Sequence, residues 1–334
     1  MANNTSLTRD YSRIFALMAD KLTGENIIWD NVSVGTPLLF SMKELFNAMV
    51  AVDGQPHLRF TIMKELPTTL GYTDQDTITP VRPDPFTSAV YVWKQLATPV
   101  LVTGLDIIKT GDDGIEDLLE GFLQAAEISH REALGGSALG IFSDGGNSED
   151  GEITGLQTLV SSTPTTGTVG NINRANVSIW QNQSGNVAST FDSTGLNIMR
   201  TLYRQCSRYN EVPQVVVLNG STMDNFEREL TSTFQVHLPL SVGPGEQGMI
   251  DAGFPNIRYK GAWMFHDDGC PANRGYMLNF KYLKYYYRRG RNAEITDFQK
   301  EFGKDNLAAA VLTAGNLCTT GPKFQGALLN GDTY

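Results

Sequence analysis

Residues 57–103 constrain the fold of this chain most strongly. The segments 57–66 and 88–103 are rich in the β-branched, aromatic and apolar residues that favour strands. Between them lie Pro67, Gly71 and Pro80 among aspartates and threonines, a composition that cannot pack on itself. We therefore predict a long two-stranded excursion with a mobile tip. Because an isolated hairpin is marginally stable in water, we expect something else to cover it.

The longest predicted helix spans about residues 113–135. Asp112 or Asp113 can cap its first turn, and Gly135-Gly136 can end it. Its apolar residues recur at a spacing of three to four, which indicates one buried face. These residues are Ile115, Leu118, Leu119, Phe122, Leu123, Ala126 and Ile128.

The remaining segments predict a mixed α+β chain. An alternation of helix and strand is expected at 193–209, 212–218 and 221–234, with further strands at 257–265 and 275–287. Short strands are expected at 153–160 and 175–180, and a closing pair at 307–312 and 324–328 is left open between helix and strand. Near the N-terminus we expect an amphipathic segment at 9–22, a strand at 26–34 and a short helix at 40–50.

The charge of the chain excludes several classes of function. Thirty-six acidic and 26 basic residues give a formal net charge of −10, which argues against a dedicated nucleic-acid binder. No apolar run approaches the ~20 residues of a membrane-spanning helix, and the N-terminus lacks the features of a signal peptide. Three widely spaced cysteines predict neither a disulfide framework nor a zinc site, so a reducing compartment is expected.

Three segments carry a superficial resemblance to functional motifs. Residues 243–248 match G-x-G-x-x-G, but Gly253 and Pro255 end any helix that could follow, so a loop is favoured over a dinucleotide site. His266, Asp267, Asp268 and Cys270 could bind a metal, although a turn before Pro271 is favoured. The acidic segment 144–152 lacks the spacing of a calcium loop. We expect no catalytic residue, no cofactor and no metal.

One basic and aromatic segment stands out at 281–291. Interleaved tyrosines and cations can stack on bases and neutralise phosphates. As a strand, however, the segment would divide these side chains between two faces. A contact between subunits is therefore favoured over a continuous nucleic-acid platform.

Taken in order, these segments resemble the major capsid protein of tailed bacteriophages, with the Hong Kong 97-type fold. The hairpin at 57–103 resembles the extended loop of that family, and the helix at 113–135 resembles its spine helix. Residues 152–159, with Gly155-Leu156, are similar to the segment that follows the spine helix. The helix, buried strand and Asn-containing turn at 191–226 are similar to its axial domain.

The resemblance implies a division of the chain into five parts. These are an N-terminal arm (1–48), an extended β-hairpin loop (49–103), a peripheral domain with the spine helix (104–145), an axial domain (146–288) and the C-terminal part of the peripheral domain (289–334). Because the arm and loop fill the space before the spine helix, we expect no fused scaffolding domain. Some members cross-link a loop lysine to a distant asparagine, but nothing in this sequence supports that chemistry, so we do not predict it.

The resemblance further implies a structural protein without enzymatic activity. It would assemble into hexamers and pentamers of an icosahedral head that encloses double-stranded DNA non-specifically. It would form in the host cytoplasm, without a membrane, and separate scaffolding, portal and decoration proteins would be its further partners. The candidate inter-subunit contacts are Lys64, Arg82, Trp93, Lys94, Lys281, Lys284, Arg288, Arg289 and Arg291.

Two other functions remain open. An encapsulin-like, non-viral shell protein would share the same fold, and the sequence alone barely separates it from a phage capsid protein. A soluble α/β hydrolase is the second alternative.

Overall fold

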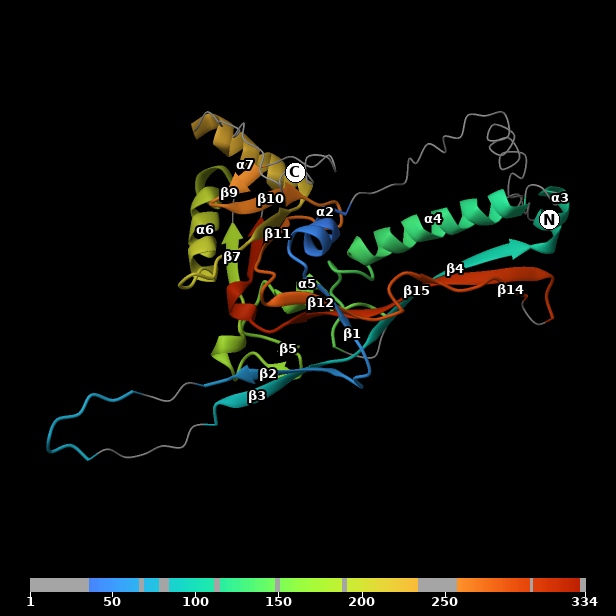
Figure 1. The fold of residues 1–334 in the computed structure, drawn as a ribbon. Coiled ribbons are helices and arrows are strands. Elements are labelled where there is room, and N and C mark those ends of the chain that lie inside the picture. Colours follow the sequence, from blue (N-terminus) through green and yellow to red (C-terminus); the bar gives the residue numbers. More distant parts are fainter. Residues whose placement is uncertain are drawn as a thin grey trace, which may run out of the picture.

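A computed structural model describes residues 36–65, 69–77, 84–110, 115–147, 151–187, 191–233, 257–300 and 303–330. Two six-stranded sheets form the body of the chain, and a separate two-stranded hairpin projects from it. One long helix, α4 (Ile115–Gly135), extends away from one of the two sheets, so the described chain has an elongated outline (Figure 1).

The first sheet is built around its longest strand, β15 (Asn306–Thr319), and is called the β15 sheet. β15 pairs antiparallel with β4 (Lys94–Thr103) on one side and with β12 (Leu283–Arg288) on the other. The short strands β13 (Glu294–Ile295) and β14 (Gln299–Lys300) also pair with β15, and β1 (Met49–Val52) runs parallel to β12.

The long helix α4 (Ile115–Gly135) packs along β4 and β15. A small apolar cluster joins them, with Ala126 on the helix and Val100 and Val311 on the two strands. The described part of the predicted 113–135 helix is therefore confirmed. The preceding helix α3 (Gly104–Thr110), which follows β4 directly, was not predicted.

The second sheet has the order β7-β16-β11-β8-β10-β9 and is called the β11 sheet. Its buried strand β8 (Val215–Leu218) alternates between two cores, because Val215 and Val217 face one cluster while Val216 and Leu218 face another. The helices α6 (Phe191–Cys206) and α7 (Gly220–Thr233) contribute to the second of these clusters. The other strands are β7 (Gln183–Val187), β9 (Ile257–Tyr259), β10 (Ala262–His266), β11 (Arg274–Leu278) and β16 (Gly326–Asn330).

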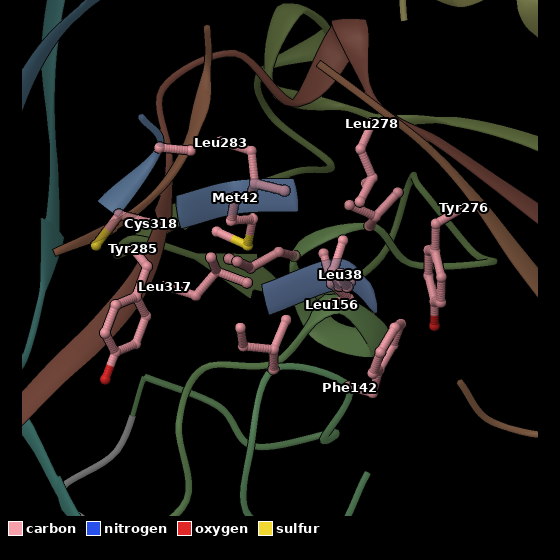
Figure 2. Close-up of a cluster of buried hydrophobic side chains, with 14 of the residues drawn as sticks. Leu38, Met42, Phe142, Leu156, Tyr276, Leu278, Leu283, Tyr285, Leu317 and Cys318 are labelled. Carbon is pink, nitrogen blue, oxygen red and sulfur yellow. The ribbon is translucent and has the colours of Figure 1, made fainter. Parts of the chain in front are cut away.

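A continuous apolar core joins the two sheets. Figure 2 shows Leu283, Tyr285 and Leu317 of the β15 sheet on one side of this core and Tyr276 and Leu278 of the β11 sheet on the other. The helices between them supply Leu38, Met42 and Leu156. Because the core is shared, the two sheets are parts of one packed unit.

Short elements complete the core and its margins. They are α2 (Pro37–Phe40), the π-helical turn η1 (Ser41–Leu45), α5 (Leu156–Leu159), the small hairpin β5 (Thr168–Val169) and β6 (Ile172–Asn173), and the 3-10 turns η3 (Ser178–Trp180) and η4 (Pro322–Phe324). The projecting hairpin consists of β2 (Leu58–Met63) and β3 (Phe86–Tyr91), paired from Leu58 with Tyr91 to Met63 with Phe86.

Several predicted elements differ from the structure. The segment 153–160 forms the helix α5 and 175–180 forms η3, so neither is a strand. The segment 257–265 is a hairpin, because Lys260 and Gly261 both adopt positive φ angles (49° and 89°) in a tight turn. The segment 275–287 divides into β11 and β12, which lie in different sheets.

The expected part boundaries also differ from the strand pairing. β1 and β4 belong to the β15 sheet, so the projecting hairpin is shorter than residues 49–103. β12 was expected in the axial part but pairs with β15, whereas β16 was expected in the peripheral part but pairs with β7 and β11. The predictions for 9–22, 26–34 and 243–248 lie outside the described residues.

Candidate assembly surfaces

The projecting hairpin exposes apolar side chains that no other described part of the chain covers. Met63 and Phe86 form its last strand pair and are 47% and 60% exposed. Toward the tip, Leu70 and Tyr72 are 61% and 68% exposed, and every described residue of 69–77 is exposed. Figure 1 shows this tip far from both sheets. Exposed apolar groups on a projecting arm are typical of a surface that another chain covers.

The root of the hairpin is held by a network of buried and partly buried hydrogen bonds. Asn316 Nδ2 donates to the carbonyl of Val92 over 2.8 Å, and the Val92 amide donates to Asn147 Oδ1 over 3.0 Å. Asn147 Nδ2 donates in turn to the carbonyl of Val90 over 2.8 Å. The hydroxyl of Tyr91 donates to the carbonyl of Thr319 over 2.8 Å. The residues that end the return strand β3 are therefore fixed to β15 and to the segment after α4.

An aromatic contact fixes the base of the same hairpin. The rings of Phe60 on β2 and Tyr286 on β12 lie 5.0 Å apart between centroids. Phe60 also contacts Tyr91 in an edge-on arrangement at 6.2 Å. The base is thus packed on the β15 sheet while the tip is exposed, so the hairpin is a fixed arm with a free end.

A second exposed apolar surface lies at the end of the β15 sheet beside α3. Leu101 on β4 is 44% exposed, and Leu105 and Ile108 on α3 are 54% and 76% exposed. Figure 1 shows α3 at the opposite end of the molecule from the hairpin tip. Two separate apolar surfaces at opposite ends allow one chain to contact different neighbours.

The basic segment 281–291 is only partly free to meet a neighbour. Lys281 forms an ion pair with Glu211, and Arg289 forms one with Asp53 over 3.5 Å. Arg288 at the end of β12 is exposed and Arg291 is half-buried, with its Nη1 3.4 Å from Gln95 Oε1. Lys284 is half-buried within β12.

Comparison with solved structures identifies the arrangement. The chain is similar to the capsid subunit of cyanophage A-1(L), with a TM-score of 0.66 at 15% identity over 92% of this chain and 95% of the other. It is also similar to the capsid of the native GTA particle (TM-score 0.58, 11% identity, 89% and 91% covered). A third match is the SrpI encapsulin of Synechococcus elongatus PCC 7942 (TM-score 0.54, 13% identity, 95% and 96% covered). The chain has the Hong Kong 97-type shell-protein fold.

The resemblance inferred from the sequence is therefore confirmed at the level of the fold. No protein-family profile matches the chain, and no curated protein matches its sequence. The fold is shared with these structures at identities of only 11% to 15%.

Within the Hong Kong 97-type fold, the candidate contact residues have different positions. Lys64 lies on the hairpin, 3.7 Å from Asp84, and Trp93 donates from Nε1 to the carbonyl of Gln55 at its root. Lys94 is 2% exposed within β4, so its side chain is buried inside the subunit. It is therefore not a contact to a neighbour, contrary to the expectation from the sequence. Arg82 lies outside the described residues.

Residues 267–270 form the turn that the sequence favoured, and among the residues that the structure describes no group of three His, Cys, Asp or Glu side chains could hold a metal ion. Asp267 instead accepts hydrogen bonds from the amides of Leu38 (3.1 Å) and Gly269 (2.9 Å). Burial raises the pKa of the Asp267 carboxyl, and these two hydrogen bonds oppose the rise. Cys270 is buried in the turn, and burial raises the pKa of its thiol.

Sequence reasoning did not find the asparagines at the root or the exposed end of α3. Asn147 and Asn316 are far apart in the chain, and a lone asparagine carries no signal of its role. The run Leu105 to Ile108 does carry a signal, because apolar residues there continue beyond the end of a strand. Among the described helices, none is long and apolar enough to cross a membrane.

Proposed function

We propose that this chain is the major capsid subunit of a tailed bacteriophage and acts as a structural protein without enzymatic activity. The observation that carries the proposal is the fixed arm: a hairpin anchored at its root by Asn147 and Asn316 and exposing apolar residues at its free end. An arm of this kind is stable only when another chain covers it. The Hong Kong 97-type fold supports a copy of the same chain as that partner.

The subunit would have a peripheral region built on the β15 sheet and α4, and an axial region built on the β11 sheet. Axial regions would meet around the symmetry axes of hexamers and pentamers. The hairpin and the α3 end would contact different neighbours, which supports an extended, closed surface instead of a single dimer. Weak contacts suffice in such a shell, because closure makes them cooperative.

Polar contacts would orient the neighbours. We propose that Lys64 and Trp93 on the hairpin, with Arg82, and the cations Lys281, Lys284, Arg288, Arg289 and Arg291 contribute to these contacts. Arg288 and Arg289 are exposed at the end of β12 and would face the acidic segment 144–152 of an adjacent copy. Opposite charges at the rim of an interface fix its register more than they increase its affinity.

The shell would enclose double-stranded DNA in a virion assembled in the host cytoplasm. A net charge of −10 per subunit supports enclosure by closure of the shell, because a mostly acidic lining does not hold DNA tightly. Separate scaffolding, portal and decoration proteins would complete the particle. An encapsulin-like compartment is the second candidate, favoured by the similarity to the SrpI encapsulin over 95% of this chain.

Electron microscopy of the purified protein tests the proposal. We expect closed particles tens of nanometres wide that form with increasing protein concentration. A stable monomer or dimer under all assembly conditions would contradict it. Expression together with a portal and a DNA-packaging motor separates the two shells, since a phage head would fill with DNA and a compartment would retain only a protein cargo.

A further inference from the structure

The exposed side of α6 carries basic residues, although the chain as a whole is acidic. Arg200 and Arg204 are exposed one turn apart on this helix, and Arg208 is exposed in the turn that follows it. Lys260, in the turn between β9 and β10, is also exposed. These four residues are called the α6 stripe. Figure 1 shows α6 beside β7 and β9, at the other end of the molecule from α3.

Contacts between aromatic residues hold the members of the α6 stripe close together. The Tyr203 hydroxyl donates to the carbonyl of Lys260 over 3.0 Å, and Lys260 Nζ lies 5.2 Å from the centroid of the Tyr203 ring. The rings of Tyr203 and Tyr259 lie 5.9 Å apart. Arg200 lies one helical turn before Tyr203 on α6, and its positive charge opposes the rise in the pKa of Tyr259 that burial causes. Two separate elements thus bring their cations to one surface.

The cations of the α6 stripe are not neutralised within the described part of the chain. None of the four has a carboxylate partner within 4.0 Å among the described residues. Glu211 follows Arg208 closely in the sequence, but its carboxylate binds Lys281. A surface with four uncompensated cations on a chain of net charge −10 needs a separate explanation.

Helix stabilisation explains only part of the stripe. Cations near the C-terminus of α6 interact favourably with the helix dipole, which accounts for Arg204 and Arg208. The effect is confined to the last turn, so it does not account for Arg200, and it does not concern Lys260 on another element. A ligand with several negative charges accounts for all four.

Tyr209 adds an aromatic group to the same surface. Its side chain is 93% exposed, and the Arg208 guanidinium lies 5.8 Å from its ring centroid. The backbone of Tyr209 has a φ of 54°, a conformation that is uncommon for any residue except glycine. The turn therefore presents a large ring to solvent beside the cations, where the ring can contact a sugar or accept stacking.

We propose that the α6 stripe binds the phosphate backbone of duplex DNA. Residues four apart on a helix are separated by about 6 Å along its axis, and duplex DNA carries one charge per ~1.7 Å of its own axis, so several phosphates fall within reach of the stripe. Binding through the backbone is independent of sequence. The inference adds a local DNA contact to the proposed function, and it would place the α6 side of each subunit toward the interior of the shell.

DNA binding by the unassembled subunit tests this inference. Two fluorescent 30-base-pair duplexes of unrelated sequence are titrated at salt concentrations from 50 to 200 mM, and binding is followed by anisotropy. The variant R200Q/R204Q/R208Q is compared with the wild-type chain and with K43Q/R59Q/R131Q, which removes the same charge from exposed basic residues elsewhere. Circular dichroism confirms that each variant is folded, and R200K/R204K/R208K tests whether charge suffices.

We expect the wild-type chain to bind both duplexes equally and the α6 variant to bind at least tenfold more weakly at 50 mM salt. The slope of log affinity against log salt should fall by about 2 to 3, with the lysine variant near the wild type and the control variant unchanged. Equal binding by the α6 variant and the wild type, or no salt-dependent binding by the wild type, would overturn the inference. The inference would also be overturned if the α6 variant bound DNA as the wild type does but assembled poorly, because the stripe would then bind an acidic surface of a neighbouring subunit.

Electron microscopy of the same variants separates this inference from the proposed function. If the α6 variant forms intact shells but no longer binds DNA, both proposals are supported. If the wild-type chain binds DNA through the stripe but forms no shells, the inference is supported and the shell function is contradicted. If the wild-type chain forms shells but does not bind DNA, the shell function is supported and the inference is overturned.

Discussion

Asp267 and Leu38 are joined by a hydrogen bond of 3.1 Å from the backbone amide of Leu38 to a carboxylate oxygen of Asp267, across 229 positions of the sequence. Leu38 lies in the first turn of α2, whose start has no side-chain cap of its own. The carboxylate therefore satisfies an amide that the helix cannot, and it connects the beginning of the described chain to the β11 sheet.

Replacing Asp267 tests this connection. We expect Asp267→Ala to lower the free energy of unfolding by about 1–3 kcal/mol, because it removes the acceptor of the buried Leu38 amide and of the partly buried Gly269 amide. Asp267→Asn should cost less, since its amide oxygen can still accept one of these bonds without burying a charge. Urea unfolding of the unassembled subunit at pH 7 measures both. Equal stability of the alanine variant and the wild type would contradict the assignment.

His130 predicts a loss of stability in mild acid. Its ring nitrogens lie 2.9 Å from Thr98 Oγ1 and 2.7 Å from Thr313 Oγ1, and burial lowers its pKa below the usual value near 6.5. The unfolded chain therefore takes up a proton more readily than the folded chain. The contribution of this residue to the free energy of unfolding is constant above pH 6.5 and decreases as the pH falls toward the folded-state pKa.

Denaturation between pH 7.5 and pH 5 checks this direction. The stability of the wild-type chain should decrease across the interval by more than that of His130→Gln, which has no titrating ring. His57→Gln, an exposed residue, is the control. A steeper decrease in His130→Gln than in the wild type would contradict the prediction.

Asn316 should be essential for the root of the hairpin. Its side chain is fully buried and donates to Val92 and Thr154 while accepting from the Thr154 amide. Asn316→Ala removes these bonds, and we expect a loss of about 2–3 kcal/mol. Asn147→Ala, at a half-buried position, should have a smaller effect on global stability and should mainly increase cleavage within the hairpin. Limited proteolysis followed by mass spectrometry measures that cleavage.

The hairpin tip should affect assembly without affecting folding. Leu70 and Tyr72 are exposed, so L70S/Y72S should change the free energy of unfolding by less than ~0.5 kcal/mol. If the tip is covered by a neighbouring copy, the same variant should raise the concentration required for shells at least tenfold. Light scattering measures that concentration, with T69S/T73S as a control at neighbouring exposed positions. Unchanged assembly would exclude the tip as an apolar contact.

Charge reversal at the end of β12 tests the polar contacts. Arg289 forms an exposed ion pair with Asp53, and such pairs contribute little to stability. We therefore expect R288E/R289E to remain folded and soluble but to assemble poorly, while the equivalent reversal of Arg131 on α4 has a smaller effect. Sedimentation and electron microscopy distinguish subunits from shells. Normal shells from the double variant would refute the proposed contact.

Local patterns predicted the elements whose burial is regular along the chain. The apolar stripe of α4, the buried run of β8 and the alternating strands of the hairpin all follow from one periodicity each. Prediction failed for 153–160 and 257–265, where a four-residue helix and a turn at Lys260 decide the structure. Segments this short contain too few residues for a periodicity to distinguish helix, strand and turn.

The candidate contact residues, like the secondary-structure elements, were predicted only in part from local patterns. Exposed cations at Arg288 and Arg289 were predicted from composition, whereas the burial of Lys94 was not. The alternation of β4 determines two faces, but only the pairing of β4 with β15 determines which face is covered. The hydrogen bonds of Asn147 at the root of the hairpin and the surface shared by α6 and Lys260 also depend on residues that are distant in sequence.

The sequence by itself determined the order of elements, the projecting hairpin and the acidic character of the chain, because these depend on neighbouring residues and on sums over composition. Only the tertiary structure decided that β12 joins β15 in one sheet while β16 joins β7 and β11 in the other, that Asn316 anchors the hairpin, and that Lys260 lies against Tyr203 of α6. These relationships result from the shared apolar core, which selects one strand pairing among many that local propensities allow.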